Sequence, residues 1–134
     1  MSESVFVDTG AWFAAVVPWD ANHTRAAAWF ERNQRTLMTT DFVVDETLTL
    51  LRSRGEGKRA ITIGERFFRG GLATVHFLTP DQIESAWRVF RRFRDKRWSF
   101  TDCTSKVVME ELGCSTAIAF DEHFRQFGTV AVEP

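Results

Sequence analysis

Short apolar runs rich in β-branched and aromatic residues alternate along the chain with longer segments whose apolar residues recur at helical spacing. The runs predict strands over residues 4–7, 36–39, 73–78, 115–120 and 129–132. The periodic segments predict helices over 9–17, 41–54, 58–69, 80–94 and 101–112, a further helix after Asp20, and a helical turn over 122–126. Because helical segments connect the strands, the pattern favours one α/β domain with a mostly parallel central sheet of four to five strands and helices on both faces.

Local signals mark several of the expected helix boundaries. Thr79 can cap the helix that follows it, Pro80 suits the first helical position, and Gln82 can close a capping box. Gly113 stands where the helix over 101–112 would end in a left-handed residue. Asp20 is the candidate cap of the second helix.

Acidic residues gather at one expected edge of the sheet. Asp8 and Asp121 each come directly after a predicted strand. The binding crevice of an open parallel sheet lies beyond the carboxyl ends of its strands, which places both aspartates at that edge. Asp102 opens one helix, and Glu46 lies in the first turns of another that follows a strand. Four carboxylates from four separate segments are therefore expected to converge.

Such a group of carboxylates predicts a cation. Ionised carboxylates a few ångströms apart repel one another, so some must become protonated or a cation must enter. All-oxygen ligands favour a hard divalent ion, Mg²⁺ or Mn²⁺, and the chemistry indicated is metal-assisted hydrolysis or phosphoryl transfer. Each residue also has a local interpretation: Asp102 as a helix cap, Asp8 and Asp121 as turn residues, and Glu46 as a solvated helix residue.

Five short motifs carry a resemblance to a known family. In chain order they are VFVDT at 5–9, DFVVDETL at 41–48, SFTDC at 99–103, MEELG at 109–113 and FDEHF at 120–124. In this order and at this spacing the chain resembles the PIN-domain nucleases, and within them the VapC-like toxins of bacterial toxin–antitoxin pairs. The resemblance covers nearly the whole chain and implies a single PIN-like nuclease domain over residues 1–134.

The resemblance implies a toxin endoribonuclease that depends on Mg²⁺ or Mn²⁺. Asp8, Glu46, Asp102 and Asp121 match the family's four acidic positions, where a metal-activated water hydrolyses an RNA phosphodiester to leave a 5′-phosphate and a 3′-hydroxyl. Two hydroxyl positions also match, and these residues could support a ligand carboxylate or simply cap their helices: Thr9 and Thr101. Either Asp121 or its neighbour Glu122 could supply the fourth acid, although Asp121 follows the strand directly.

The resemblance also implies partners. VapC-like proteins pair as homodimers and are silenced by a small, partly disordered antitoxin that often places a basic side chain near the acidic site. The substrate would be RNA. His123, close to Asp121 in sequence, could face a scissile phosphate, although a surface or structural role is favoured for it.

Composition narrows the rest. The chain has 134 residues with a formal net charge of −1 at pH 7, so any attraction to nucleic acid must come from a local patch. Residues 88–98 hold six basic and three aromatic side chains. This pattern suits RNA, by phosphate contacts and base stacking, and the candidate contacts are Arg91, Arg92, Arg94, Lys96 and Arg97. The alternative is an amphipathic helix with Phe90 and Phe93 in the core and the arginines in water.

Cellular location is predicted from absences in the sequence. The longest apolar run, residues 11–19, is too short to span a bilayer, and no basic segment precedes a hydrophobic stretch at the start of the sequence. Two cysteines, Cys103 and Cys114, make no disulfide framework and suggest reduced thiols. We expect a cytoplasmic protein without a membrane partner.

Competing functions fit less well. The triplet Asp8-Thr9-Gly10 matches aspartic proteases, but those are all-β proteins. A haloacid-dehalogenase-like phosphatase needs a second aspartate where Gly10 stands, and a receiver domain needs an acidic pair and a late lysine. Two alternatives keep the PIN fold: a nuclease of RNA processing that is not a toxin, and a catalytically silent module that binds RNA or protein.

Overall fold

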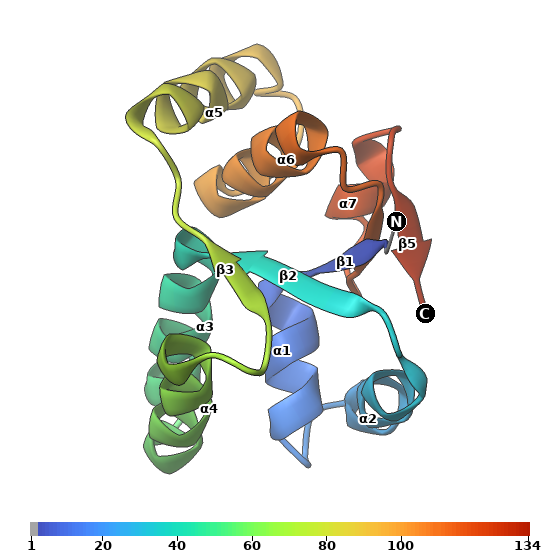
Figure 1. Cartoon of the computed structure of the whole chain (residues 1–134). Coiled ribbons are helices and arrows are strands. Elements are labelled where there is room, and N and C mark those ends of the chain that lie inside the picture. The colour runs from blue at the N-terminus through green and yellow to red at the C-terminus, as the bar shows by residue number, and fades with distance from the viewer. Residues whose placement is uncertain (1–2) are drawn as a thin grey trace.

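Five parallel strands form the central sheet, in the order β3-β2-β1-β4-β5 (Figure 1). In this computed structural model, which describes residues 3–134, the strands are β1 (Ser4–Val7), β2 (Thr36–Thr40), β3 (Thr74–His76), β4 (Thr116–Ile118) and β5 (Ala131–Glu133). Every pairing between neighbouring strands is parallel. The apolar run that ends β1 is fully buried, as a strand covered on both faces requires.

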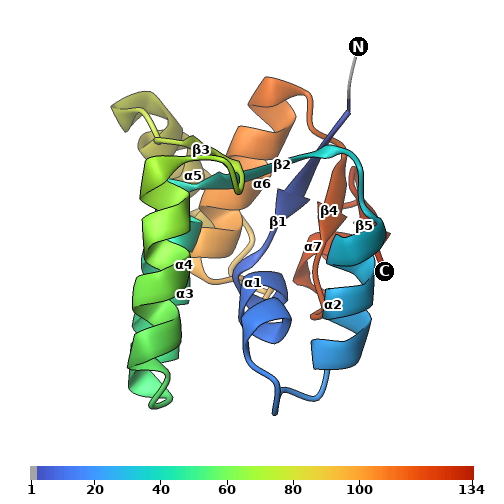
Figure 2. The same cartoon turned by 60° about the horizontal axis from the view of Figure 1, so that its bottom comes forward.

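Helices cover both faces of the sheet, which confirms the predicted α/β architecture. They are α1 (Thr9–Val16), α2 (His23–Arg32), α3 (Asp41–Ser53), α4 (Gly57–Arg69), α5 (Pro80–Arg92), α6 (Phe100–Leu112) and α7 (His123–Gln126). Figures 1 and 2 show α1 to α4 on one side of the sheet and the pair α5 and α6 on the other. None of the helices described in residues 3–134 is long and apolar enough to cross a membrane.

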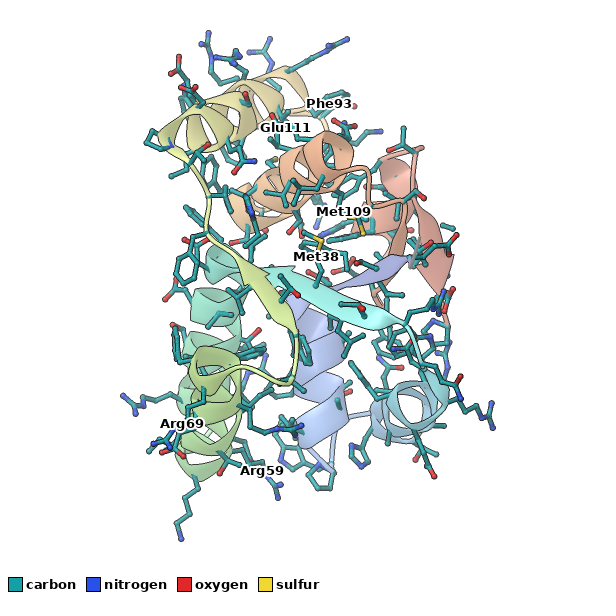
Figure 3. All side chains as sticks on the ribbon, viewed as in Figure 1. Met38, Arg59, Arg69, Phe93, Met109 and Glu111 are labelled. Atoms are coloured by element: carbon teal, nitrogen blue, oxygen red, sulfur yellow. The ribbon has the colours of Figure 1, made fainter. Side chains whose placement is uncertain are left out.

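The core fills the space on both sides of β1. On one side Trp12 of α1 stacks on Phe30 and meets the edge of Phe67, with ring centroids 5.5 and 5.0 Å apart. On the other side the buried side chains of Met38 on β2 and Met109 on α6 lie between the sheet and that helix (Figure 3). These layers hold the carboxyl end of β1, where Asp8 lies, in a fixed place.

Several predicted boundaries are confirmed. Thr79 and Gln82 form both hydrogen bonds of the capping box at the start of α5. Gly113 ends α6 in the left-handed conformation, with φ of 70°. The strand expected over 73–78 is an exception: it is shorter, from Thr74 to His76, and the N–H of Leu78 beyond it donates to a carboxylate oxygen of Asp41 (3.1 Å) instead of to a strand.

Other boundary predictions are wrong. The strands expected over 115–120 and 129–132 lie at Thr116–Ile118 and Ala131–Glu133. Asp20 does not cap α2, because its carboxylate accepts from the N–H of Asn22 (2.9 Å) and Asn22 itself precedes the first helical residue. The helix expected to reach Arg94 ends at Arg92, where the chain turns and the Phe93 ring packs on Trp98 with centroids 5.0 Å apart.

The apolar face of α5 does not face the core, contrary to what the interpretation of this segment as a simple amphipathic helix predicted. Ile83, Trp87 and Phe90 remain 36%, 50% and 39% exposed, so Phe90 is not in the core. The helix packs on α6 through another face, which contains the buried Gln82 and Ala86. An amphipathic period gives the width of an apolar face but does not identify what covers it.

Candidate functional site

Asp8 is the most buried carboxylate at the carboxyl edge of the sheet. It follows β1 and precedes α1, it is only 4% exposed, and its side chain makes no cap hydrogen bond. Burial raises the pKa of this carboxyl well above its ordinary value, and the negative charges of Asp102, Asp121 and Glu46 raise the pKa further. The backbone N–H of Thr9 offsets only part of this effect. Asp8 is therefore a group that a nearby positive charge would stabilise.

Asp102 lies in the first turn of α6 and is 5% exposed. It forms a capping box with Ser99, so the local interpretation as a helix cap holds. Its Oδ2 accepts both from the N–H of Ser99 (2.9 Å) and from Nδ1 of His123 (2.7 Å). Burial raises the pKa of Asp102, and these two contacts oppose the shift. Because both contacts fall on Oδ2, the cap leaves Oδ1 for another ligand.

Asp121 lies three residues beyond β4, with its side chain 48% exposed. Its Oδ1 accepts from the N–H of His123 (3.0 Å). Its charge contributes to the raised pKa of both Asp8 and Asp102. Glu122 is exposed and precedes α7, and it is not among the carboxylates that raise the pKa of Asp8. The geometry thus favours Asp121 over its neighbour as the fourth acid.

Glu46 lies in the second turn of α3, half-buried. Of the three carboxylates that raise the pKa of Asp8, it has the smallest effect. Its helix begins directly after β2, where Thr40 caps it by accepting from the N–H of Val43 (3.1 Å). The start of α3 therefore brings Glu46 to the same edge of the sheet as the other acids.

The two supporting hydroxyls differ. The Thr9 hydroxyl is buried beside Asp8 in sequence and has no hydrogen-bond partner in the structure. Thr101 is half-buried, and its carbonyl accepts from the hydroxyl of Thr104 (2.6 Å). Thr9 is thus a buried polar group that still lacks a partner, whereas the contact seen at Thr101 belongs to its helix.

The four acids form an open cluster. Their charges meet at Asp8, two members are buried, and the other two are partly exposed. Within residues 3–134, no three His, Cys, Asp or Glu side chains already stand close enough together to hold a metal ion. The arrangement is a set of hard oxygen donors around a carboxyl that lacks a side-chain partner.

Comparison with known proteins identifies the family. Residues 5–130 match the family described as PIN domain. The chain belongs to the PIN domain family. Over 130 residues it is 35% identical to the 23S rRNA-specific endonuclease VapC20 of Mycobacterium tuberculosis, across 97% of this chain and 98% of that protein. Over 127 residues it is 32% identical to a VapC ribonuclease of Archaeoglobus fulgidus, across 90% of this chain and 79% of that protein.

Solved structures agree with this assignment. The crystal structure of Mycobacterium tuberculosis VapC20, described as a sarcin–ricin loop cleaving toxin, is similar to this PIN domain with a TM-score of 0.90 and 33% identity, covering 97% of this chain and 99% of the other. FitAcB from Neisseria gonorrhoeae matches with a TM-score of 0.66 at 17% identity, over 97% and 96% of the two chains, which shows the shared fold alone. The predicted resemblance to VapC-like toxin ribonucleases is confirmed.

The basic segment of this PIN domain, residues 88–98, lies beside the acidic cluster. Gln82 of α5 donates to Glu111 of α6 (3.1 Å), and at the other end of the pair the rings of Phe90 and Phe100 are 6.0 Å apart, so the two helices run antiparallel. The connection between them therefore ends at the start of α6, where Asp102 lies. All five predicted RNA contacts are exposed at the surface: Arg91, Arg92, Arg94, Lys96 and Arg97.

Two further residues near the site have clear roles. The thiol of Cys103 is buried, and burial together with the charge of Asp102 raises its pKa to about 11, so it is protonated at neutral pH and is no nucleophile. His123 contacts both Asp102 and Asp121. Its contact with Asp102 was not predicted from the sequence. Its place two residues after Asp121 was the only available signal.

Proposed function

We propose that this PIN domain is the toxin of a toxin–antitoxin pair and that it hydrolyses RNA at the cluster of Asp8, Glu46, Asp102 and Asp121. The observation that carries the proposal is the carboxyl of Asp8. It is buried without a side-chain partner at the point where the charges of three other carboxylates act. Carboxylates that are buried close together and repel one another are typical of a site that binds a positively charged ligand, because the ligand stabilises their charges.

The residues suit a divalent cation, Mg²⁺ or Mn²⁺. Carboxylate and hydroxyl oxygens are the donors that such hard ions prefer, and the orphaned hydroxyl of Thr9 adds a buried polar atom in need of a partner. When bound, the cation would supply positive charge to the phosphodiester and lower the pKa of a coordinated water. Asp8 and Asp102 would hold it from fixed backbone positions. The partly exposed Glu46 and Asp121 would turn to complete the set.

Ribosomal RNA of the large subunit is the proposed substrate, cleaved to leave a 5′-phosphate and a 3′-hydroxyl. The support is the 35% identity, over nearly the full length of both chains, to an endonuclease named for 23S rRNA. A substrate of this kind also implies action in the cytoplasm. Within this RNA the proposed target is a single-stranded loop, because sequence-specific recognition of RNA overwhelmingly uses unstacked bases.

The basic segment is proposed to hold the RNA backbone. An acidic cluster repels phosphates, so a nuclease with a net charge of −1 needs local positive charge next to it. An open groove of about 980 Å³ between α5 and α6 is lined by Arg91, Arg92 and Arg94 on the α5 side. Its α6 side contains Lys106, which pairs with Glu110 (2.6 Å), and Glu111, so the positive charge of the groove comes from the arginines. Arg92 also lies over the Phe93 ring, 5.3 Å from its centroid, which holds the side chain at the groove.

Two protein partners complete the proposal. A small antitoxin would bind the open groove of about 1050 Å³ between α1, α2 and α4, whose lining combines Trp12, Phe30 and Ile63 with the basic Lys58 and Arg66. Such a lining suits an amphipathic acidic segment.

A second copy of the chain would cover the exposed apolar face of α5 and form a homodimer.

The test is cleavage of purified ribosomes and of protein-free rRNA by the wild type with Mg²⁺, with Mn²⁺ and with EDTA. Asp8→Asn is the inactive variant, and Asp45→Asn, an exposed acid of α3, is the matched control. Discrete fragments that need the metal and disappear only in Asp8→Asn support the proposal. RNA binding without cleavage under any of these conditions would instead favour a silent binding module, and cleavage of other RNAs alone would favour a processing nuclease.

A further inference from the structure

One histidine joins two carboxylates of the acidic cluster. Nδ1 of His123 lies 2.7 Å from Oδ2 of Asp102, and the backbone N–H of the same residue donates to Oδ1 of Asp121 (3.0 Å). The ring is 26% exposed, whereas the Asp102 side chain is 8% exposed. An ionised carboxylate can only accept, so Nδ1 is assigned as the protonated nitrogen.

The helix that carries His123 is held firmly although it has only four residues. Phe124 is fully buried against Phe6 of β1, with ring centroids 5.8 Å apart. At the other end of α7, Phe127 meets the edge of Trp98 at 5.0 Å, and the indole N–H of Trp98 donates to Gln126 (2.9 Å). The imidazole therefore reaches Asp102 from a support anchored in the core.

These contacts decide which carboxylate oxygens remain available. Oδ2 of Asp102 already accepts from Ser99 and from His123, which leaves Oδ1. Oδ1 of Asp121 accepts from the His123 backbone. Its Oδ2 lies 3.7 Å from Nδ1 of the same ring, beyond hydrogen-bond distance, and so has no hydrogen bond to His123. A hydrogen bond that fixes one oxygen of a carboxylate also fixes the direction of the other.

We propose that His123 is a positioning residue: its Nδ1–H locks the Asp102 carboxylate so that Oδ1 is presented to a divalent cation. The inference rests on the proposed function, because it assumes that the acidic cluster binds such an ion. The side chain of His123 acts through Asp102 and not on the RNA. Its backbone contact to Asp121 does not depend on the ring and survives any substitution that leaves α7 in place.

Three variants separate the hydrogen bond from the bulk of the ring. In His123→Asn the amide nitrogen stands near the position of Nδ1 and can still donate to Asp102. In His123→Gln the amide nitrogen stands nearer the position of Nε2, and in His123→Ala no donor remains. Arg125→Ala, an exposed change on the same helix, controls for general effects on α7.

The first measurement is Mn²⁺ binding to the full-length, metal-free protein by titration calorimetry, with thermal unfolding to check that each variant is folded. Removing a hydrogen-bond partner of a metal ligand typically weakens metal affinity about 10- to 100-fold. We expect this weakening in His123→Ala and His123→Gln, and near wild-type affinity in His123→Asn and Arg125→Ala. A long-range ¹H–¹⁵N spectrum of the metal-free wild type should show Nδ1 protonated.

The outcomes are distinct. Wild-type Mn²⁺ affinity in His123→Ala and His123→Gln overturns the inference and leaves the proposed metal site intact. An equal decrease of affinity in His123→Asn also overturns it, because the ring itself would then matter. If the wild type binds no Mn²⁺ at all, the metal-dependent function falls and this inference with it, while the spectrum still reports the hydrogen bond to Asp102.

Discussion

Val7 of β1 pairs in parallel register with Ile118 of β4, and the N–H of Asp8, one residue further on, donates to the Ile118 carbonyl (3.2 Å). The two strands therefore end level with each other. This register brings Asp8 and Asp121 to the same edge of the sheet from positions 113 residues apart in the sequence. It also explains why their like charges raise the pKa of Asp8.

Replacing Asp8 should separate activity from stability. We expect Asp8→Asn to abolish RNA cleavage and to raise the free energy of unfolding at pH 7 by about 1 kcal/mol, because an ionised carboxylate is removed from a buried site beside three others. Urea unfolding of the metal-free protein measures the change, with Asp45→Asn as the exposed control. A destabilised, fully active Asp8→Asn would contradict both the electrostatic and the catalytic roles.

The stability of the metal-free protein should depend on pH with a defined sign. Folding raises the pKa of Asp8 above its ordinary value of 3.8 and also raises that of Asp102, so between the unfolded and folded pKa values the native state binds more protons. Stability should therefore fall as the pH rises through this window. Denaturant unfolding in EDTA from pH 4 upward tests this. Asp8→Asn should flatten the curve, and a wild-type curve that rises instead would contradict the assigned shifts.

Divalent cations should stabilise the wild type without any RNA present. A ligand that binds only the folded state at 100 times its dissociation constant adds about 2.7 kcal/mol to the free energy of unfolding. We expect Mg²⁺ and Mn²⁺ to raise the melting temperature of the wild type and of Asp45→Asn, but not of Asp8→Asn or Asp102→Asn. An equal rise in all four proteins would indicate binding elsewhere.

The basic segment should determine how RNA binding depends on salt. Removing one arginine that neutralises a phosphate of single-stranded RNA should lower the slope of log affinity against log salt by about 0.7. We expect this for Arg91→Ala and for Arg94→Ala, measured by fluorescence anisotropy with Asp8→Asn as the background to prevent cleavage. Arg69→Ala is the control, because this exposed arginine lies on α4, on the other side of the sheet (Figure 3). An unchanged slope in both variants would place the RNA away from this segment.

The sequence predicted those features that are set by short-range chemistry. The β1 run between 4 and 7, the capping box at Thr79 and the left-handed Gly113 each depend on a few adjacent residues, and the structure has them as expected. The parallel sheet followed from the alternation of strands and helices. Since the ends of parallel strands share an edge, the convergence of Asp8 and Asp121 could be predicted as well.

Features that depend on tertiary packing were not predictable in the same way. The hydrogen bond between His123 and Asp102 joins residues 21 positions apart and depends on how α7 sits against Trp98. Helical periodicity showed that α5 has an apolar face, but only the structure shows that Gln82 and Ala86 face α6 while Trp87 remains exposed. A periodic pattern reports the face and not its partner.

The exposed face of α5 gives the test of the proposed homodimer. Its acidic residues, Asp81 and Glu84, lie in the first half of the helix, and the basic Arg88 lies in the second. Two copies packed antiparallel through Trp87 would place each acidic half opposite a basic half, as a self-complementary two-fold contact requires.

We therefore expect the wild type to sediment at twice the monomer mass of 15.4 kDa and Trp87→Glu to sediment as a monomer. Burying two new carboxylates at the two-fold axis would cost far more than an exposed substitution. Phe68→Glu, at an exposed phenylalanine of α4, should stay dimeric and controls for the removal of an aromatic side chain. A dimer that survives Trp87→Glu but dissociates in Phe68→Glu would move the interface to α4, and a monomeric wild type would remove the homodimer from the proposed function.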